Sequence, residues 1–113
     1  MYGAVPPTHL PFDVVGVGAN SLDYVYMLPG FPRPDSPTAK LPITAHRLSP
    51  GGQVATTLST CAALGLRTTY VGTFGSDDNA ARVREALGAH GVDLGFAVTR
   101  NARNPFAVVL IDE

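Results

Sequence analysis

The chain has 113 residues, of which 45% are hydrophobic and 15% are charged, and its formal net charge is −1 at pH 7. This is enough for one small domain with a core, and the absence of a basic run disfavours nucleic acid as a partner. Residues 1–11 lack the pattern of a signal peptide, and no stretch approaches the ~20 apolar residues of a membrane helix. We therefore predict a cytoplasmic protein without membrane contact.

Cysteine and histidine give no sign of a disulfide or a metal centre. Cys61 is the single cysteine, so it has no internal partner, and its apolar neighbours Leu58 and Leu64 favour a small buried hydrophobe over a nucleophile. The three histidines are scattered without paired spacing. No metal site is predicted.

The first half of the chain is rich in proline, and we expect mostly strands and loops there. Residues 1–11 are predicted to be a flexible tail. Residues 12–18 form a short run rich in β-branched side chains, which is typical of a strand covered on both faces. We predict a central parallel strand at this position.

The next segment, residues 16–21, contains two glycines and suggests a dinucleotide-binding turn. The third glycine is missing, and no helix is predicted to follow. Side chains 22–28 instead alternate with a period of two, which predicts a strand. Asp23 is then a lone carboxylate near the start of that strand. It can accept hydrogen bonds from the hydroxyl groups of a ligand or cap the preceding turn, and the local sequence leaves both interpretations open.

A proline-rich linker and a further strand come next. Residues 31–37 are predicted to be a rigid linker, and residues 38–48 a strand that Pro42 restricts to an edge or an irregular ribbon. An exposed ribbon of this kind is a candidate lid or dimer contact.

Gly51 and Gly52 stop this strand and precede a helix. Paired glycines tolerate positive φ and allow another molecule to approach the main chain, and the first helical turn carries amides without intrahelical partners. The pair therefore suggests a backbone binding site, and the alternative is a tight turn without a ligand. Apolar residues then recur at helical spacing from Val54 until Gly65, where we expect the helix to end.

The second half alternates strands with a helix. We predict a strand at 67–74, a helix that Ser76 or Asp77 caps and Gly91 ends, and strands at 92–98 and 105–111. The inner stripe of that helix consists of Ala80, Val83, Ala86 and Leu87. Strands and helices in this order indicate an α/β fold with a parallel sheet and an added ribbon.

The order of these parts resembles the N-terminal portion of the ribokinase-like (PfkB) family of carbohydrate and nucleoside kinases. The motifs that carry the resemblance are Gly18-x-x-x-x-Asp23, Pro32-x-Pro34, Gly51-Gly52, Leu64-Gly65 and Gly75-x-Asp77. The resemblance covers residues 12–113 and implies a three-layer α/β/α fold with a parallel sheet and a small β lid, of which only the N-terminal part is present. The lid strands would be 22–28, 38–48 and 105–111.

The resemblance also implies a substrate-binding site. Asp23 would bind sugar hydroxyls, and Gly51 and Gly52 would lie against the sugar. Polar residues would complete the pocket, and these are Ser21, Gln53 and Thr56. The family usually has asparagine where this chain has Thr56, and a hydroxyl in place of an amide changes what can be recognised.

The function implied is the acceptor-substrate half of an ATP-dependent carbohydrate or nucleoside kinase. Phosphoryl transfer needs a base, a cradle for the triphosphate and a cation site. In the family the base and the ATP pocket lie in a C-terminal half, which this chain lacks, so no catalytic, cofactor-binding or metal residue is predicted here. ATP and Mg²⁺ would be bound by the complete enzyme and not by this segment. The expected partners are a sugar or nucleoside, the missing half and a second copy through the lid strands.

Two alternatives belong to other classes. One is a non-catalytic sugar- or nucleoside-binding module, a pseudo-enzyme that uses the same pocket without chemistry. The other is a small Rossmann-type oxidoreductase domain, which the strand predicted after Ser21 disfavours.

Overall fold

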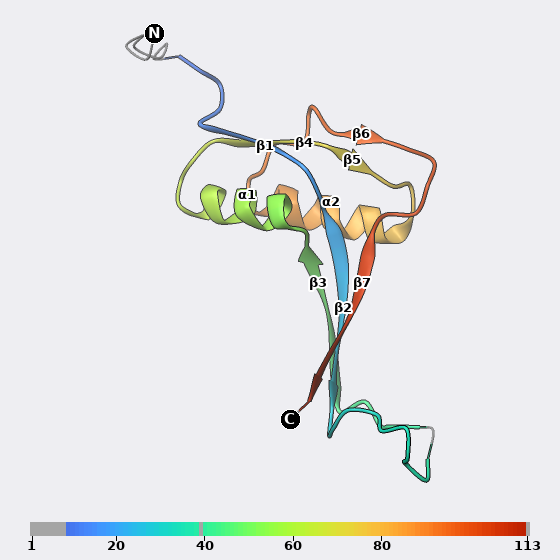
Figure 1. The fold of residues 1–113 in the computed structure, drawn as a ribbon. Coiled ribbons are helices and arrows are strands. Elements are labelled where there is room, and N and C mark those ends of the chain that lie inside the picture. Colours follow the sequence, from blue (N-terminus) through green and yellow to red (C-terminus); the bar gives the residue numbers. More distant parts are fainter. Residues whose placement is uncertain (1–8, 39, 113) are drawn as a thin grey trace, which may run out of the picture.

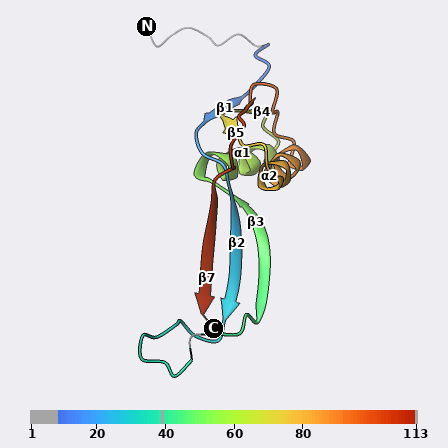
Figure 2. The same ribbon diagram turned by 90° about the vertical axis from the view of Figure 1, so that its right-hand side faces the viewer.

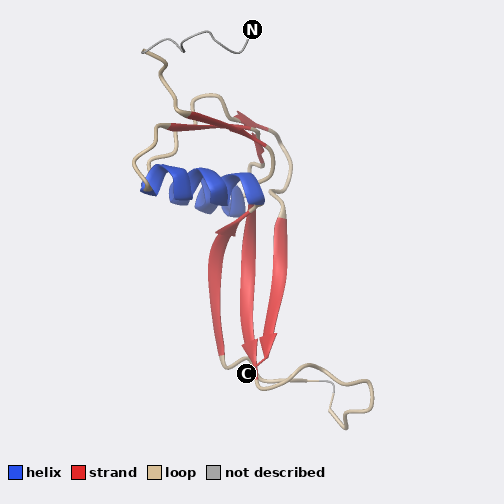
Figure 3. Ribbon diagram, turned by 60° about the vertical axis from the view of Figure 1, so that its left-hand side comes forward, coloured by secondary structure: helices blue, strands red, loops and turns tan. Residues whose placement is uncertain are grey.

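The computed structural model describes residues 9–38 and 40–112. Most of the tail predicted at 1–11 lies outside these ranges. One part of the chain is a layer of short parallel strand pairs with two helices packed on one face (Figures 1 and 3). Its elements are β1 (Val14–Val17), α1 (Gln53–Ala63), β4 (Thr68–Val71), β5 (Thr73–Phe74), α2 (Asp78–Ala89) and β6 (Val98–Thr99). We call this part the body, and it has the predicted α/β architecture.

The other part is a three-stranded sheet that extends away from the body, and we call it the lid (Figures 1 and 2). It consists of β2 (Ser21–Leu28), β3 (Ala45–Gly51) and β7 (Phe106–Asp112), in the order β3-β2-β7. The central strand β2 pairs antiparallel with β3 and parallel with β7. A segment near the C-terminal end of the chain therefore lies beside one near its beginning.

The strand register divides the lid into two faces. Asp23 lies opposite Ser49 on β3 and Ala107 on β7, so these side chains share one face. Tyr24 belongs to the other face, where its hydroxyl donates to Asn79 Oδ1 of α2 at 2.7 Å. The face that carries Asp23 is therefore the one directed away from α2.

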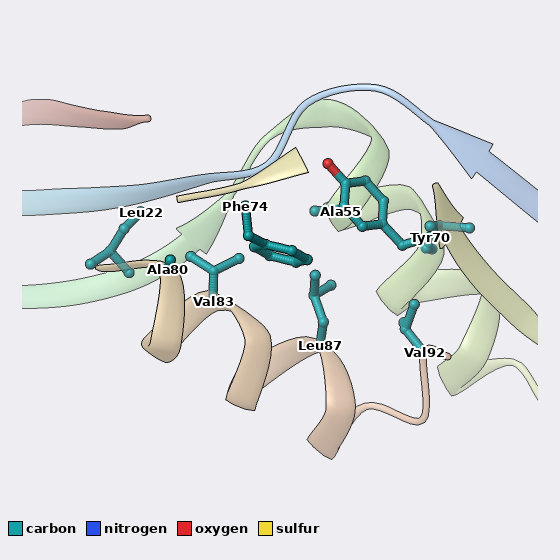
Figure 4. Close-up of a cluster of buried hydrophobic side chains, with 9 residues drawn as sticks. Leu22, Ala55, Tyr70, Phe74, Ala80, Val83, Leu87 and Val92 are labelled. Carbon is teal, nitrogen blue, oxygen red and sulfur yellow. The ribbon is translucent and has the colours of Figure 1, made fainter. Parts of the chain in front are cut away.

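The core lies between the helices and the short strands (Figure 4). Tyr70 and Phe74 are fully buried and meet edge to face, with ring centroids 5.4 Å apart. Val83 and Leu87, from the predicted inner stripe of α2, pack against them. Burying a large apolar side chain contributes about 1.5–3 kcal/mol, so this cluster stabilises the α2–strand contact.

The opposite face of the body carries exposed valines. Val15, Val17 and Val98 are 58%, 71% and 56% exposed. Gly16 faces α1 and Thr99 pairs with the buried Phe74, so these valines, which alternate with them, face away from the helices. The sequence predicted a strand at 12–18 that is central and covered on both faces. Within the described residues this is wrong, since β1 pairs with β4 alone and helices cover one face.

Several boundaries differ from the sequence-based predictions. The strand predicted at 38–48 begins at Ala45, after the segment that contains Pro42. The strand predicted at 67–74 is interrupted at Gly72. Most of 92–98 is not a strand, because Asp93 makes a single bridge to Thr69 and a turn follows it.

The predicted helix ends are confirmed. Asp77 is the N-cap of α2 and accepts a hydrogen bond from the Ala80 amide at 3.1 Å. Gly65 and Gly91 follow the two helices with φ values of 90° and 86°. Both glycines therefore act as left-handed helix terminators.

Candidate functional site

The carboxylate of Asp23 lies over the end of β3. A Cβ atom added at Gly51 would lie 2.5 Å from Asp23 Oδ2 and 2.7 Å from Oδ1. Ser21 lies opposite Gly51 in the register, and its hydroxyl donates to Asp23 Oδ1 at 3.0 Å. Glycine at position 51 therefore makes the room that the carboxylate occupies, and Ser21 orients it.

Gly52 is required for a different reason. It is the N-cap of α1 with φ of 93°, as the sequence predicted for a glycine pair, and it supplies no side-chain cap. A Cβ atom there would lie 2.6 Å from Asn20 Cα and 2.7 Å from the carbonyl oxygen of Ala19. The Ala55 amide donates to the same carbonyl at 3.3 Å. The start of α1 is thus packed directly against the loop between β1 and β2.

A pocket of about 560 Å³ lies beside this contact. Its walls include Val17 and Val71, the last residues of β1 and β4, together with Ser21, Gly52 and Gln53. Ligands of open α/β sheets bind outside the carboxyl ends of the strands, which is where this pocket lies. The structure thus brings three of the predicted site residues to one pocket, and Ser21 links Asp23 to its rim.

Thr56 is not brought to this pocket. It lines a separate groove of about 380 Å³, whose other walls include Gly51, Ser59, Leu87 and His90. Gln53 begins α1 at the edge of the first pocket, and Thr56 lies about one helical turn further along. The predicted site residues are therefore divided between two neighbouring hollows, with Ser21, Gly52 and Gln53 at the first and Gly51 and Thr56 at the second. Asp23 lines neither hollow and contacts Ser21 and the space over Gly51.

Sequence reasoning missed a buried polar cluster under the pocket. Asn20, Tyr70 and Asn104 are 3%, 0% and 1% exposed and are joined by hydrogen bonds of 2.9 Å. Asn20 and Tyr70 also line the pocket. Their separations along the chain are 50 and 84 residues, so no local pattern signals that they meet.

The two helix N-termini differ in what they offer an anion. The carboxylate of Asp77 already accepts from the Ala80 and Asn104 amides at the start of α2, so that terminus is closed by negative charge. The start of α1 carries no side-chain cap. The described residues around Asp77 do not fit the triphosphate of ATP, because the carboxylate of Asp77 would repel it.

Within residues 9–38 and 40–112, no group of three or more acidic, histidine or cysteine side chains is arranged to hold a metal ion. Neither helix of this part of the chain has the length and apolarity to cross a bilayer.

Asp13 and Arg67 form an ion pair outside the pocket. They directly precede β1 and β4, so they lie at the ends of these strands that are away from the pocket. The Arg67 side chain donates to both carboxylate oxygens, at 3.1 and 2.8 Å, and its amide donates at 2.8 Å. These side-chain hydrogen bonds, followed by the backbone one, lower the pKa of Asp13 to about 2. The pair joins the starts of two parallel strands and is remote from the pocket.

The chain is similar in sequence to a known kinase. No family model matches the chain. A nucleoside kinase of Methanothermobacter thermautotrophicus is 33% identical over 101 residues, which are 88% of this chain and 32% of the relative. The chain therefore spans about a third of the length of that relative.

Solved structures share the fold. The ribokinase of Arabidopsis thaliana, complexed with ribose and ATP, is 25% identical with a TM-score of 0.74, covering 91% of this chain and 33% of that one. The nucleoside kinase of Methanocaldococcus jannaschii is 22% identical with a TM-score of 0.71, covering 88% and 32%. The predicted ribokinase-like fold is confirmed, and so is the predicted resemblance of the chain to the N-terminal portion of ribokinase-like (PfkB) kinases.

Proposed function

We propose that this chain supplies the acceptor-substrate half of an ATP-dependent kinase that phosphorylates a hydroxyl of a sugar or nucleoside. The printed names of its relatives, a nucleoside kinase and a ribokinase with ribose and ATP, support this class of reaction. The observation that carries the proposal is the Asp23 carboxylate, which lies over Gly51 and accepts a hydrogen bond from Ser21 in the pocket wall. A carboxylate beside bare backbone suits a ligand with several hydroxyl groups.

Each residue of the site has a proposed role. Asp23 accepts charge-assisted hydrogen bonds from two hydroxyls of the acceptor, and Ser21 fixes the orientation of its carboxylate. Gly52 offers its main chain in the pocket wall to the acceptor, and Gln53 contributes an amide at the pocket edge. Thr56 lies across Gly51 in the neighbouring groove, so we assign it a role in shaping the site from behind.

The phosphate donor belongs to other parts of a complete kinase in this proposal. Transfer requires a base for the hydroxyl, a cradle for the phosphates and a cation. Bound ATP with Mg²⁺ would supply the phosphoryl group. We assign neither to a described residue, because the start of α2 is closed by Asp77.

The lid is also proposed to contact a second copy of the chain. Three side chains of β7 on the face opposite to Asp23 are exposed, and these are Phe106, Val108 and Leu110 at 54%, 58% and 42%. An apolar stripe along an edge strand is a surface that another sheet can cover.

Titration of the protein with ribose and with adenosine tests the site. We expect the amides of Gly51 and Gly52 to shift in NMR spectra on saturation, and Asp23→Asn to abolish the shift by removing the charge while keeping the shape. Asp35→Asn, in the exposed loop between β2 and β3, is the control. Absence of binding by the unaltered protein would contradict the proposal. In a protein that joins this chain to the remaining parts of the kinase fold, binding without phosphorylation in the presence of ATP and Mg²⁺ would favour the non-catalytic module instead.

A further inference from the structure

Two buried asparagines lie where two strands of the lid leave the body. Asn20 directly precedes β2, and Asn104 is separated from β7 only by Pro105. The Leu22 amide donates to the carbonyl of Pro105 at 3.1 Å, so the two strand starts are also joined through the backbone. The pair Asn20–Asn104 therefore sits at the base of the lid, and we call it the asparagine clamp.

The clamp is one chain of hydrogen bonds whose direction is fixed. The Gly75 amide can only donate, so Asn104 presents Oδ1 to it at 3.0 Å and turns Nδ2 to Asn20 Oδ1 at 2.9 Å. Asn20 in turn directs its Nδ2 to the carbonyl of Thr73, at 2.9 Å, and to Tyr70 Oη. Flipping either amide would place two donors or two acceptors against each other.

The clamp also holds the pocket loop. The Tyr70 hydroxyl donates a hydrogen bond to the carbonyl of Gly18 at 2.6 Å. Figure 4 shows this hydroxyl at the edge of the core, directed away from α2. The carbonyl oxygen of Ala19 accepts a hydrogen bond from the Ala55 amide of α1. The loop that leads into Ser21 and Asp23 is thus fixed from below by Tyr70 and from the side by the helix that follows Gly52.

The clamp reaches α2 as well. The Asn104 amide donates to both oxygens of the Asp77 cap at 3.2 Å. A side chain at Gly75 would overlap the backbone of Asn104, so this segment packs without a gap. The bases of β2 and β7 are therefore tied to one helix start and to the β4–β5 segment.

We propose that Asn20 and Asn104 are positioning residues that fix the lid at its base so that Asp23 lies over the glycine pair. This role rests on the proposed function, in which Asp23 binds the acceptor. A primary amide is suited to it because one planar group donates and accepts at once. Asn104 is not among the walls of the pocket, and Asn20, which is, already uses its side-chain amide for hydrogen bonds to Tyr70, Thr73 and Asn104. Both asparagines therefore act through Asp23 and Ser21.

Asn104→Asp tests the clamp in a complete kinase that contains this chain, because it keeps the shape and the acceptor for Gly75 but replaces the donor to Asn20 by an oxygen. Asn101→Asp, the same change at an exposed position of the same turn, is the control. We expect the KM for the acceptor to rise about tenfold in Asn104→Asp, with the KM for ATP unchanged. A fall in kcat with an unchanged acceptor KM would show a merely structural role and overturn the proposal.

Amide hydrogen exchange provides a readout that does not depend on activity. We expect the Leu22 and Ala55 amides to exchange about tenfold faster in Asn104→Asp, with the interior amides of α2 unchanged. If the unaltered protein phosphorylates no sugar or nucleoside, the proposed function fails, and exchange alone decides the clamp. Protection equal to that of Asn101→Asp would overturn it. If Asn104→Asp does not fold, Asn104→Ser replaces it as the test variant, because serine keeps one hydroxyl group. An acceptor KM and a Leu22 exchange rate equal to those of the unaltered protein would then overturn the proposal.

Discussion

The carboxylate of Asp23 occupies the space in which a side chain on Gly51 would lie, 2.5 Å from the ideal Cβ position. The two residues are on neighbouring strands, and their fit depends on the antiparallel register of β2 and β3. The absence of a side chain at Gly51 thus leaves room for the Asp23 carboxylate on the lid. The requirement for glycine at position 51 is steric, whereas that at position 52 is also conformational.

Gly51→Ala should lower acceptor affinity more than stability. The added methyl meets a carboxylate that can rotate, so we expect an unfolding free-energy loss below ~1 kcal/mol and about a tenfold weaker acceptor binding. Gly30→Ala is the control, because a Cβ atom there meets nothing within 4 Å. Thermal unfolding and calorimetric titration measure the two effects. A variant that binds as tightly as the unaltered protein would mean that the position of Asp23 is unimportant.

Asp23→Ala should cost about 1.5–3 kcal/mol of acceptor binding, the range for a charge-assisted hydrogen bond, and leave the fold intact. Asp35→Ala, in the exposed loop, is expected to change neither quantity. Titration with ribose and adenosine and a melting curve check both. Unchanged affinity would return Asp23 to the role of a turn cap.

Gly52→Ala should destabilise the protein more than Gly65→Ala. Both glycines have positive φ, 93° and 90°, so each substitution introduces backbone strain of about 1–2 kcal/mol. Only at Gly52 does the new methyl also collide with the β1–β2 loop, since nothing lies within 4 Å at Gly65. We expect a difference of at least ~1 kcal/mol in denaturant unfolding. Equal losses of unfolding free energy in the two variants would show that backbone strain alone explains the glycine at position 52.

The Asp13–Arg67 pair should stabilise the fold at neutral pH and lose this effect in acid. Hydrogen bonds from Arg67 lower the pKa of Asp13 from 3.8 to about 2. Since the folded-state pKa is the lower one, the contribution is complete above pH 3.8 and disappears as the pH falls to about 2. Melting temperatures of the unaltered protein and Asp13→Asn should therefore converge in that window. A difference that stays constant as the pH falls through this window would exclude the ionised pair as its cause.

The exposed valines of the body should make the 113-residue chain self-associate. Val17 is 71% exposed on the face without helices, so Val17→Lys is expected to raise the monomer fraction in sedimentation velocity. Leu64→Lys is the matched control, because Leu64 is 77% exposed at the end of α1 and away from that face. A monomeric unaltered chain at all concentrations would contradict the prediction.

The sequence by itself determined the elements that depend on local order. The period of two at 22–28 predicted β2, and Gly65, Asp77 and Gly91 predicted helix ends that the structure confirms. These signals are short-range, because side-chain periodicity and capping are properties of a few consecutive residues. The glycine pair, with Gly52 at positive φ, belongs to the same class.

The tertiary structure decided everything that depends on which distant segments meet. Residues 92–98 contain apolar side chains, but only Val98–Thr99 finds a partner strand, because pairing rather than propensity makes a strand. Thr56 shares the motif of Gln53 yet lines a different hollow. Asn20 meets Asn104 across 84 residues, and such a contact is selected by burial and hydrogen bonding in the folded chain, which no local pattern encodes.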